Sequence, residues 1–375
     1  MKTMNRSMRI ALAGALITLA PWSLAATVVV GEVAPMSGLD ANQGRAYAAG
    51  MQLAFGNANK AGVNGHTFTL VRKDDGGRPE DTVSVTRQLL AEDKPLVLAG
   101  YFGNRNVDDL VSAGLLQANK IALVGYRSAE IRGETPYLYS VRAGLRDEIN
   151  KLTQHLSTIG ITRLGLLYEE GPGAPALLAA AEEAAKKAQG AIVAKASYPA
   201  GTARVSPAVN TFVATPPQAI IMVSSGAAAA GFIEQYRAAG GAAQLFAHSG
   251  ADIEQLSKRL SEEQMQGVAI AQVTPSPYTI SSRLAKEFND TVAKNEKLDV
   301  PVSYAMMEGY ITGKVIVEAV RRQGRSPSRE GTVAALDGMD YYDMGGYAVG
   351  FKPGMHTGSK FVELSIISGA GKIRQ

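Results

Sequence analysis

Two stretches of the chain place an aromatic side chain close to a cation. The stretch LAGYFGNR puts Tyr101 four residues before Arg105, and LVGYR puts Tyr126 directly before Arg127. A guanidinium binds a carboxylate through two parallel hydrogen bonds, and a tyrosine ring packs against planar apolar groups. Together the two stretches indicate a binding site for a small carboxylic acid, including an aromatic one.

A second interpretation is open for all four side chains. The two arginines could point into solvent beside the site, and the two tyrosines could be partly buried at strand ends. The sequence leaves both placements open for each of them.

The chain has no catalytic or metal-binding motif. It lacks a phosphate loop, a G-x-S-x-G elbow, an H-E-x-x-H pair and a helix-opening G-x-G-x-x-G, and it has no cysteine. Its four histidines lie far apart in the sequence. Glu169 and Glu170 are adjacent at a predicted strand end, where neighbouring side chains point to opposite sides. We therefore expect no enzymatic activity, no metal and no cofactor.

Composition predicts a globular protein with more than one domain. The chain has 375 residues, of which 19% are charged and 46% hydrophobic. The net charge is +4, but three of the positive charges, Lys2, Arg6 and Arg9, lie in the first nine residues. The remainder is close to neutral, which gives no reason to expect a nucleic-acid partner.

Residues 1–26 read as a secretory signal peptide. A basic start is followed by the apolar run IALAGALITLAPW and by the small residues SLAA, with cleavage expected near Ala25 or Ala26. The alternative, a short transmembrane helix, is disfavoured because the apolar run is below the roughly 18–20 residues that span a bilayer. We therefore expect an exported, periplasmic protein.

Strands and helices alternate along the rest of the chain in two successive series. The expected strands of the first series are 27–35, 66–75, 95–100 and 120–125. Those of the second series are 162–170, 191–199, 219–226, 243–250 and 267–275. Amphipathic helices separate them, and two longer helices and short strands close the chain. This pattern predicts an α/β fold with two doubly wound parallel-sheet lobes.

Several motifs carry a resemblance to a known family. They are Ser37-Gly38, Gly44, Asn57 with the segment AGVNG, Asp74-Asp75 with Pro79, and later RLGLLYEE and VSYAMMEGY. In this order they resemble the periplasmic substrate-binding proteins of ABC transporters, of the branched-chain amino-acid (leucine/isoleucine/valine-binding) type. The resemblance implies a type I periplasmic-binding fold that closes on a ligand by hinge motion.

The resemblance also implies a division into lobes joined by three chain crossings. We place the crossings near 140–144, near 273–277 and after Phe351. The expected domains are the signal peptide 1–26, an N-terminal lobe of 27–141 plus 274–357, and a C-terminal lobe of 142–273 plus 358–375.

The resemblance further implies a monomer that captures a small-molecule ligand and presents it to the permease subunits of an ABC transporter at the inner membrane. The alternatives are a ligand-sensing receptor module coupled to a signalling partner and, for another class, a secreted α/β enzyme.

Ligands of open α/β sheets bind at the carboxyl ends of the strands. The candidate ligand contacts of the first lobe are Ser37, Gln43, Tyr101, Phe102, Asn104, Arg105, Tyr126, Arg127 and Ser128. Those of the second lobe are Tyr168, Ser225, His248 and Asp252. Relatives place hydroxyls and backbone amides for a carboxylate after the third and fourth strands, and an aromatic ring where Gln43 stands.

One departure from the family concerns the ligand's ammonium group. Relatives meet it with an acidic residue at the strand end that here reads AHSGAD, where Gly250 stands in our alignment. Either Asp252 or Glu169 takes that role, or the ligand carries no ammonium.

Overall fold

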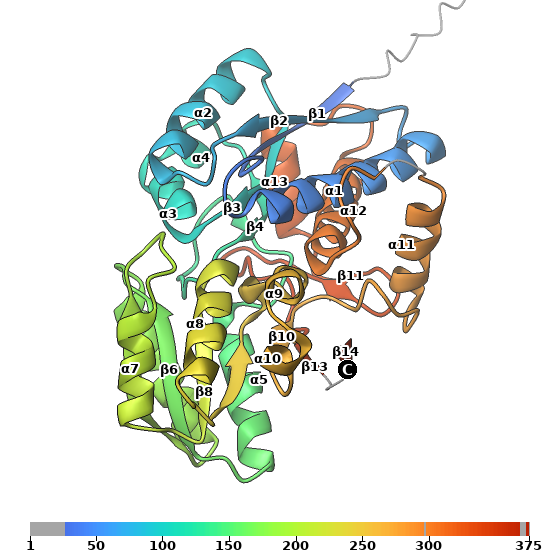
Figure 1. Ribbon diagram of the computed structural model, residues 1–375. Coiled ribbons are helices and arrows are strands. Elements are labelled where there is room, and N and C mark those ends of the chain that lie inside the picture. Colours follow the sequence, from blue (N-terminus) through green and yellow to red (C-terminus); the bar gives the residue numbers. More distant parts are fainter. Residues whose placement is uncertain (1–26, 296–297, 368–372, 375) are drawn as a thin grey trace, which may run out of the picture.

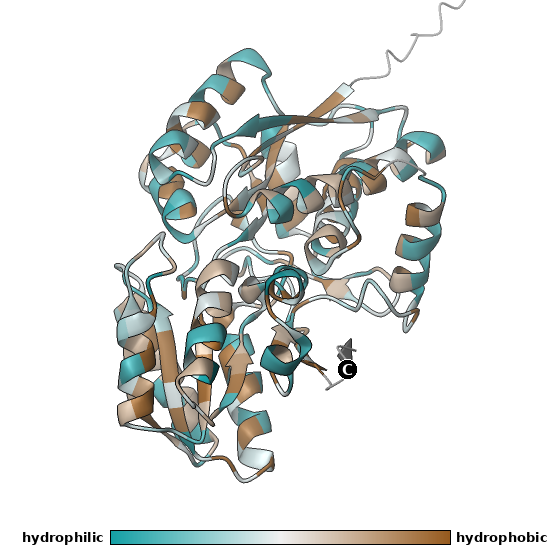
Figure 2. Ribbon diagram, in the orientation of Figure 1, coloured by the Kyte–Doolittle hydropathy of each residue, from teal (hydrophilic) through white to brown (hydrophobic). Residues whose placement is uncertain are grey.

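The chain forms two large, mainly parallel sheets, each covered by helices on both faces (Figure 1). The computed structural model describes residues 27–295, 298–367 and 373–374, so the predicted signal peptide lies outside the described residues. The apolar strands are enclosed, while the outer faces of the helices are polar (Figure 2). This confirms the predicted α/β fold class.

The first sheet has the strand order β2-β1-β3-β4-β5, and all its pairings are parallel. Its strands are β1 (Thr27–Ala34), β2 (Thr67–Asp74), β3 (Val97–Phe102), β4 (Leu123–Arg127) and β5 (Leu138–Tyr139). The helices between them are α1 (Ala41–Ala61), α2 (Pro79–Glu92), α3 (Asn104–Ser112) and α4 (Leu115–Ala118). Helices α2, α3 and α4 share one apolar cluster with the sheet, and α1 packs on the opposite face.

The second sheet has the order β14-β13-β10-β9-β8-β6-β7. Its strands are β6 (Arg163–Glu169), β7 (Ala191–Tyr198), β8 (Ala219–Val223), β9 (Gln244–Ala247), β10 (Ala269–Gln272), β13 (Glu363–Ile367) and β14 (Ile373–Arg374). Strands β6 to β10 pair in parallel, whereas β13 runs antiparallel to β10 and β14 antiparallel to β13.

Helices cover the two faces of this sheet in two groups. Those of the first group are α5 (Leu145–Thr158) and α6 (Ala174–Lys187). Those of the second are α7 (Ser206–Ala214), α8 (Gly226–Ala238), α9 (Ile253–Arg259) and α10 (Glu262–Met265), with a 3₁₀ turn at Ser249–Ala251.

The C-terminal part of the chain returns to the first sheet before it joins the second. Its elements are α11 (Arg283–Ala293), α12 (Tyr304–Gln323), α13 (Arg329–Asp337) and the antiparallel pair β11 (Tyr342–Asp343) and β12 (Ala348–Val349). Helix α12 packs along α1 in the core of the first lobe (Figure 1). No helix in the described part of the chain is long and apolar enough to cross a bilayer.

The chain therefore passes between the two sheets after β5, after β10 and after β12. Hydrogen bonds tie these passages together. The hydroxyl of Tyr347 lies 2.8 Å from the carbonyl oxygen of Val141 and 3.0 Å from that of Val273. The Ser140 amide donates to the His356 carbonyl at 2.9 Å, and the Gly358 amide donates to the Ser140 carbonyl at 2.8 Å. The three passages thus form one bonded unit between the lobes.

Candidate functional site

Two glycines decide which side chains of β3 and β4 face the second lobe. Gly100 and Gly125 have φ values of 73° and 70°, in the left-handed region that favours glycine. Each interrupts the alternation of its strand, so that the following tyrosine returns to the face covered by α2, α3 and α4. The residues after the tyrosines, Phe102 and Arg127, are paired in register and turn to the opposite side.

The structure therefore removes both tyrosines from the candidate ligand contacts. Tyr101 is completely buried, and its hydroxyl lies 2.9 Å from that of Thr86. Tyr126 packs on the same apolar cluster. Alternation along the strand would have placed both rings on the other face, and the positive φ of the preceding glycine reverses it.

Arg105 and Ser37 also point away from the other candidates. Arg105 is 62% exposed and pairs with Asp109 one turn later in α3, at 3.7 Å. Ser37 is exposed in the turn after β1, where it hydrogen-bonds Asp74. Of the two arginines in the repeated motif, only Arg127 remains at the centre of the molecule.

Arg127 is buried beside α1 and α12, with 7% of its side chain exposed. Its Nη1 donates to Oε1 of Gln43, and its Nε lies 3.3 Å from Oε2 of Glu308, an ion pair without hydrogen-bond geometry. The ring of Phe102 lies 5.8 Å from the guanidinium carbon. The start of α1 and the ends of β3 and β4 thus bring the candidates Gln43, Phe102 and Arg127 together.

A buried chain of alternating charges extends from Arg127 towards the second lobe. Glu308 also lies 3.5 Å from Nη1 of Arg142, in the first passage between the sheets. Nη2 of Arg142 donates to Glu148 of α5 at 2.7 Å and to the hydroxyl of Ser249. Burial alone would lower the pKa of Arg142, but Glu308 and Glu148 raise it above its ordinary value. Arg142 therefore stays charged between its two carboxylates, and we call the series Glu148-Arg142-Glu308-Arg127 the ion chain.

Sequence reasoning missed three members of the ion chain, because Arg142, Glu148 and Glu308 do not follow a strand in either series. A signal for Glu308 exists in the stretch YAMMEGYITG, where a lone carboxylate interrupts an apolar helix. A charge at such a position is buried and needs a partner.

The second lobe meets the ion chain at the end of β9. The Ser249 amide donates to Glu148 at 2.7 Å, and the preceding His248 is 4% exposed. Burial lowers the pKa of His248, which keeps the imidazole neutral. Since the Gly250 amide donates to Nδ1, the proton sits on Nε2, 3.0 Å from the Ser224 carbonyl. His248 is thus fixed in one tautomer.

The other candidates of the second lobe have local structural roles. The Ser225 hydroxyl caps α8 by accepting from Ala228, and the Asp252 carboxylate caps α9 by accepting from Glu254 and Gln255. Tyr168 is half-buried against the apolar cluster under α5 and α6. These contacts fix the three side chains in place at the carboxyl ends of the strands.

Asn104 and Glu169 meet across the two lobes. The carboxamide oxygen of Asn104 accepts from the Ala129 amide at 2.7 Å and from the Ser128 hydroxyl at 3.2 Å. Its nitrogen lies 3.4 Å from Oε2 of Glu169 at the end of β6. Burial raises the pKa of Glu169 although the Gly201 amide donates to it.

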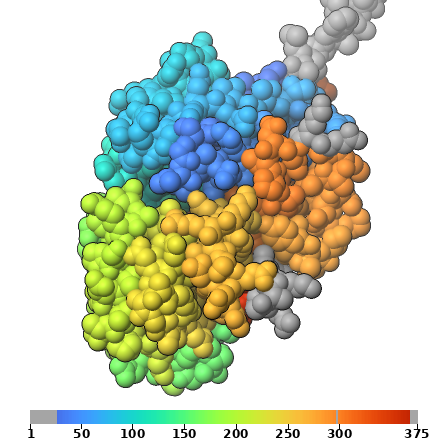
Figure 3. Space-filling model, viewed as in Figure 1, coloured from blue at the N-terminus to red at the C-terminus, as the bar shows by residue number. Residues whose placement is uncertain are grey.

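The lobes are in contact near α1 as well. Nε2 of Gln255 in α9 lies 3.3 Å from the Leu39 carbonyl oxygen. In the space-filling view, blue residues of the first lobe abut yellow to gold residues of the second (Figure 3). The structure therefore describes the two lobes closed on each other at this edge.

Asp40 is a further carboxylate at this interface that sequence reasoning missed. Burial raises its pKa, Arg127 lowers it, and Asp252 and Glu169 of the second lobe raise it further. Asp40 belongs to the turn SGLD after β1, so its position directly before α1 is the signal that could have identified it. Within the described residues no cluster of histidine and carboxylate side chains is suited to hold a metal ion.

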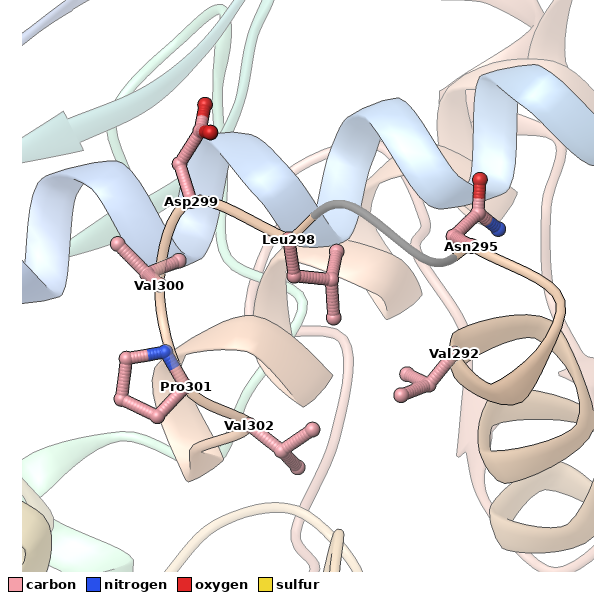
Figure 4. A pocket seen from close by; sticks show the side chains of 7 residues that line it. All are labelled: Val292, Asn295, Leu298, Asp299, Val300, Pro301 and Val302. Atoms are coloured by element: carbon pink, nitrogen blue, oxygen red, sulfur yellow. The ribbon is translucent and has the colours of Figure 1, made fainter.

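A hollow on the surface lies away from these groups. It measures about 500 Å³ and lies beside α1, between the end of α11 and the segment before α12 (Figure 4). Its lining residues are Val292, Asn295, Leu298, Asp299, Val300, Pro301 and Val302. With one charged side chain among them, this hollow does not gather the polar strand-end groups found between the lobes.

Comparison with known proteins agrees with this architecture. Residues 27–363 match the family described as periplasmic binding protein. A substrate-binding periplasmic protein from Ralstonia solanacearum is 36% identical, with a TM-score of 0.86 over 92% of this chain and 99% of that one.

More distant structures share the fold. LivJ, a branched-chain amino acid transporter substrate-binding protein from Streptococcus pneumoniae, is 18% identical, with a TM-score of 0.78 over 93% of this chain and 98% of its own. A solute-binding protein of an ABC transporter from R. palustris is 16% identical, with a TM-score of 0.79 over 93% and 95%.

One curated relative matches over a short stretch. An "Amino acid binding protein" from Pseudomonas aeruginosa is 36% identical over 78 residues, which is 20% of this chain and 21% of that protein. The family match covers most of the chain, and the fold agrees with it. The chain therefore belongs to the periplasmic binding protein family, with the type I fold of the leucine/isoleucine/valine-binding proteins.

Proposed function

We propose that this protein is the solute-binding component of an ABC importer and captures a small carboxylate-bearing solute between its lobes. The observation that carries the proposal is the convergence of Gln43 and Arg127 of one lobe with His248 and Ser249 of the other. Arg142, in the passage between the sheets, connects them. A solute bound among these groups contacts both lobes and stabilises the closed form.

Two classes of solute fit this site, an amino acid and an aromatic or aliphatic organic acid. The structure of LivJ contains isoleucine and that of the R. palustris protein contains benzoate, so the fold accommodates both classes. Asp40 distinguishes them here, because its half-buried carboxylate, whose pKa burial, Asp252 and Glu169 raise and Arg127 lowers, suits an ammonium group. An organic acid has no use for that carboxylate.

The remaining parts of the proposal follow from the same role. The N-terminal lobe comprises 27–141 plus 274–357 and the C-terminal lobe 142–273 plus 358–375. The protein acts without catalysis, as a periplasmic monomer delivered by the signal peptide 1–26, and it hands its solute to permease subunits.

A thermal-shift screen tests this function. Amino acids, aromatic acids and aliphatic acids are added singly to the purified mature protein. A bound solute raises Tm because it binds only the folded state, by RT ln(1 + [L]/Kd) in free energy. The proposal predicts a Tm that rises with the concentration of a carboxylate-bearing solute, by an amount that grows with the logarithm of [L]/Kd once [L] exceeds Kd. Turnover of the solute, or a shift only with uncharged compounds, would contradict it.

A further inference from the structure

The donors that follow β4 are already occupied by the protein's own Asn104. The Ala129 amide and the Ser128 hydroxyl both donate to the Asn104 carboxamide oxygen, at 2.7 and 3.2 Å. Arg132 holds this arrangement from the other side, with Nη2 3.0 Å from the Ser128 hydroxyl and 3.3 Å from the Asn104 carbonyl oxygen. The Asn104 oxygen thus sits where these donors would otherwise hold an oxygen of a bound acid.

Unused donors lie at the neighbouring strand ends. Gln43 is 2% exposed, and its Oε1 is taken by Arg127, while its Nε2 has no partner among the described residues. A buried N–H group without a partner is costly and rare in folded proteins, so its presence beside Arg127 at the carboxyl end of the sheet points to a ligand atom. Of the Arg127 nitrogens, Nη1 bonds Gln43 and Nε faces Glu308, and Nη2 has no hydrogen bond within the described part of the chain.

The ion chain makes this end of the site positive. Its charges alternate from Glu148 through Arg142 and Glu308 to Arg127, so the terminal group, Arg127, is a cation. A carboxylate placed there continues the alternation, whereas an ammonium placed there would face a like charge. Glu308 and Gln43 hold the guanidinium in one orientation before the solute arrives, which reduces the ordering cost of binding.

We infer that the carboxylate of the solute binds between Gln43 Nε2 and Arg127 Nη2, and not at the donors of Ser128 and Ala129. The half-buried ring of Phe102, which lies against Arg127, then contacts the apolar body attached to that carboxylate. The inference rests on the proposed function and specifies the subsite for the solute's carboxylate and the chemical class that it accepts, an acid that carries an apolar body.

Isothermal titration of variants tests this placement. The probes are L-leucine, L-isoleucine, 4-methylpentanoate and benzoate, and the acid that binds the mature wild-type protein most tightly is used throughout. Gln43→Met keeps the length of the side chain and removes the donor, and we expect it to weaken that acid roughly 10–100-fold. Gln43→Glu keeps Arg127 paired and puts a negative charge beside the carboxylate, so it weakens binding at least as much.

Arg105→Ala is the matched control, because it removes the other arginine of the repeated motif, which is exposed and pairs with Asp109 within α3. We expect its affinity for the acid to stay within about threefold of wild type. The amide of the same acid, benzamide or leucinamide for example, should not bind the wild type. Circular dichroism melting confirms that each variant folds. If Gln43→Met does not fold, Gln43→Glu answers the same question.

The outcomes separate the two levels of the proposal. Unchanged affinity in both Gln43 variants, or equal binding of acid and amide, overturns the subsite while the capture of a solute stands. If none of the four acids binds the wild type, both the proposed carboxylate capture and the subsite are wrong.

Discussion

Glu308→Gln should destabilise the protein more than any single charge removal on its surface. The carboxylate of Glu308 is 1% exposed and serves two guanidinium groups, at 3.3 Å from Arg127 and 3.5 Å from Arg142. Without it, two buried cations share Glu148 as their only carboxylate in the ion chain. Removing one partner of a buried ion pair costs about 3–5 kcal/mol because a buried charge is left uncompensated.

The lower end of that range applies here, because the partially negative amide oxygen of glutamine still lies beside both guanidinium groups. We therefore expect a loss of about 3 kcal/mol in the free energy of unfolding. For an unfolding unit of roughly 150–250 residues, Tm falls by about 2–4 °C for each kcal/mol, which gives a drop of roughly 6–12 °C.

Circular dichroism is the suitable assay, because the only tryptophan, Trp22, lies in the predicted signal peptide. Urea unfolding of the mature protein gives the free energy, and a thermal scan gives Tm. The matched control is Glu183→Gln, which breaks exposed pairs with Arg146 and Lys187 and should cost at most about 1 kcal/mol. If Glu308→Gln loses no more free energy of unfolding than Glu183→Gln, the buried ion chain does not stabilise the folded protein as argued.

Three further predictions concern other groups of the structure. Burial raises the pKa of Glu32 well above 4.5, so the folded state binds more protons than the unfolded state and the free energy of unfolding falls as pH rises from about 4.5. Glu32→Gln should therefore have a higher Tm than wild type at about pH 8 and lose this advantage at about pH 4. An equal Tm difference between variant and wild type at both pH values would show that burying the Glu32 carboxylate does not destabilise the folded state. Gly125→Ala should lower the free energy of unfolding by about 2–5 kcal/mol, because the new Cβ would collide with Tyr47 and Thr312 and position 125 has a positive φ. Gly160→Ala, at φ 79° with open space around it, should lower it by about 1–2 kcal/mol; urea unfolding measures both. Asp40→Asn should weaken an amino acid roughly tenfold or more in titration and leave an organic acid unchanged, and equal effects on both would remove Asp40 from ammonium binding.

Much of the fold could be predicted from periodicity, because both faces of the parallel strands are covered. Such strands appear as continuous apolar runs, and the runs at 95–100 and 219–226 correspond to β3 and β8. The carboxyl ends of the strands were accessible to the same reasoning, which is how Gln43, Phe102 and Arg127 were selected. What periodicity could not supply was the side on which each strand-end side chain emerges.

The repeated tyrosines show why that side was hidden. A period of two assigns Tyr101 to the same face as Ala99, yet Ala99 lies in the core beneath α1 and α12 while Tyr101 packs with α2, α3 and α4. The change depends on one positive φ at Gly100, and glycine in a strand permits such a value without requiring it. Gly125 has the same effect in β4. The repeated Gly-Tyr pair therefore marks the same backbone irregularity, a glycine with positive φ, in two neighbouring strands.

These irregularities connect the core to the site. Because Gly125 has no side chain, the Tyr47 hydroxyl and Thr312 Oγ1, 2.5 Å apart, can pack directly against β4 and hold α1 against α12 at this level. The same two helices carry Gln43 and Glu308, which fix Arg127 two residues after Gly125. A side chain at position 125 would therefore separate the helices and displace both partners of Arg127. Gly125→Ala should therefore lose solute affinity as well as stability, whereas Gly160→Ala should keep its affinity. If Gly125→Ala is destabilised but retains its affinity, the packing of α1 on α12 does not position the guanidinium of Arg127.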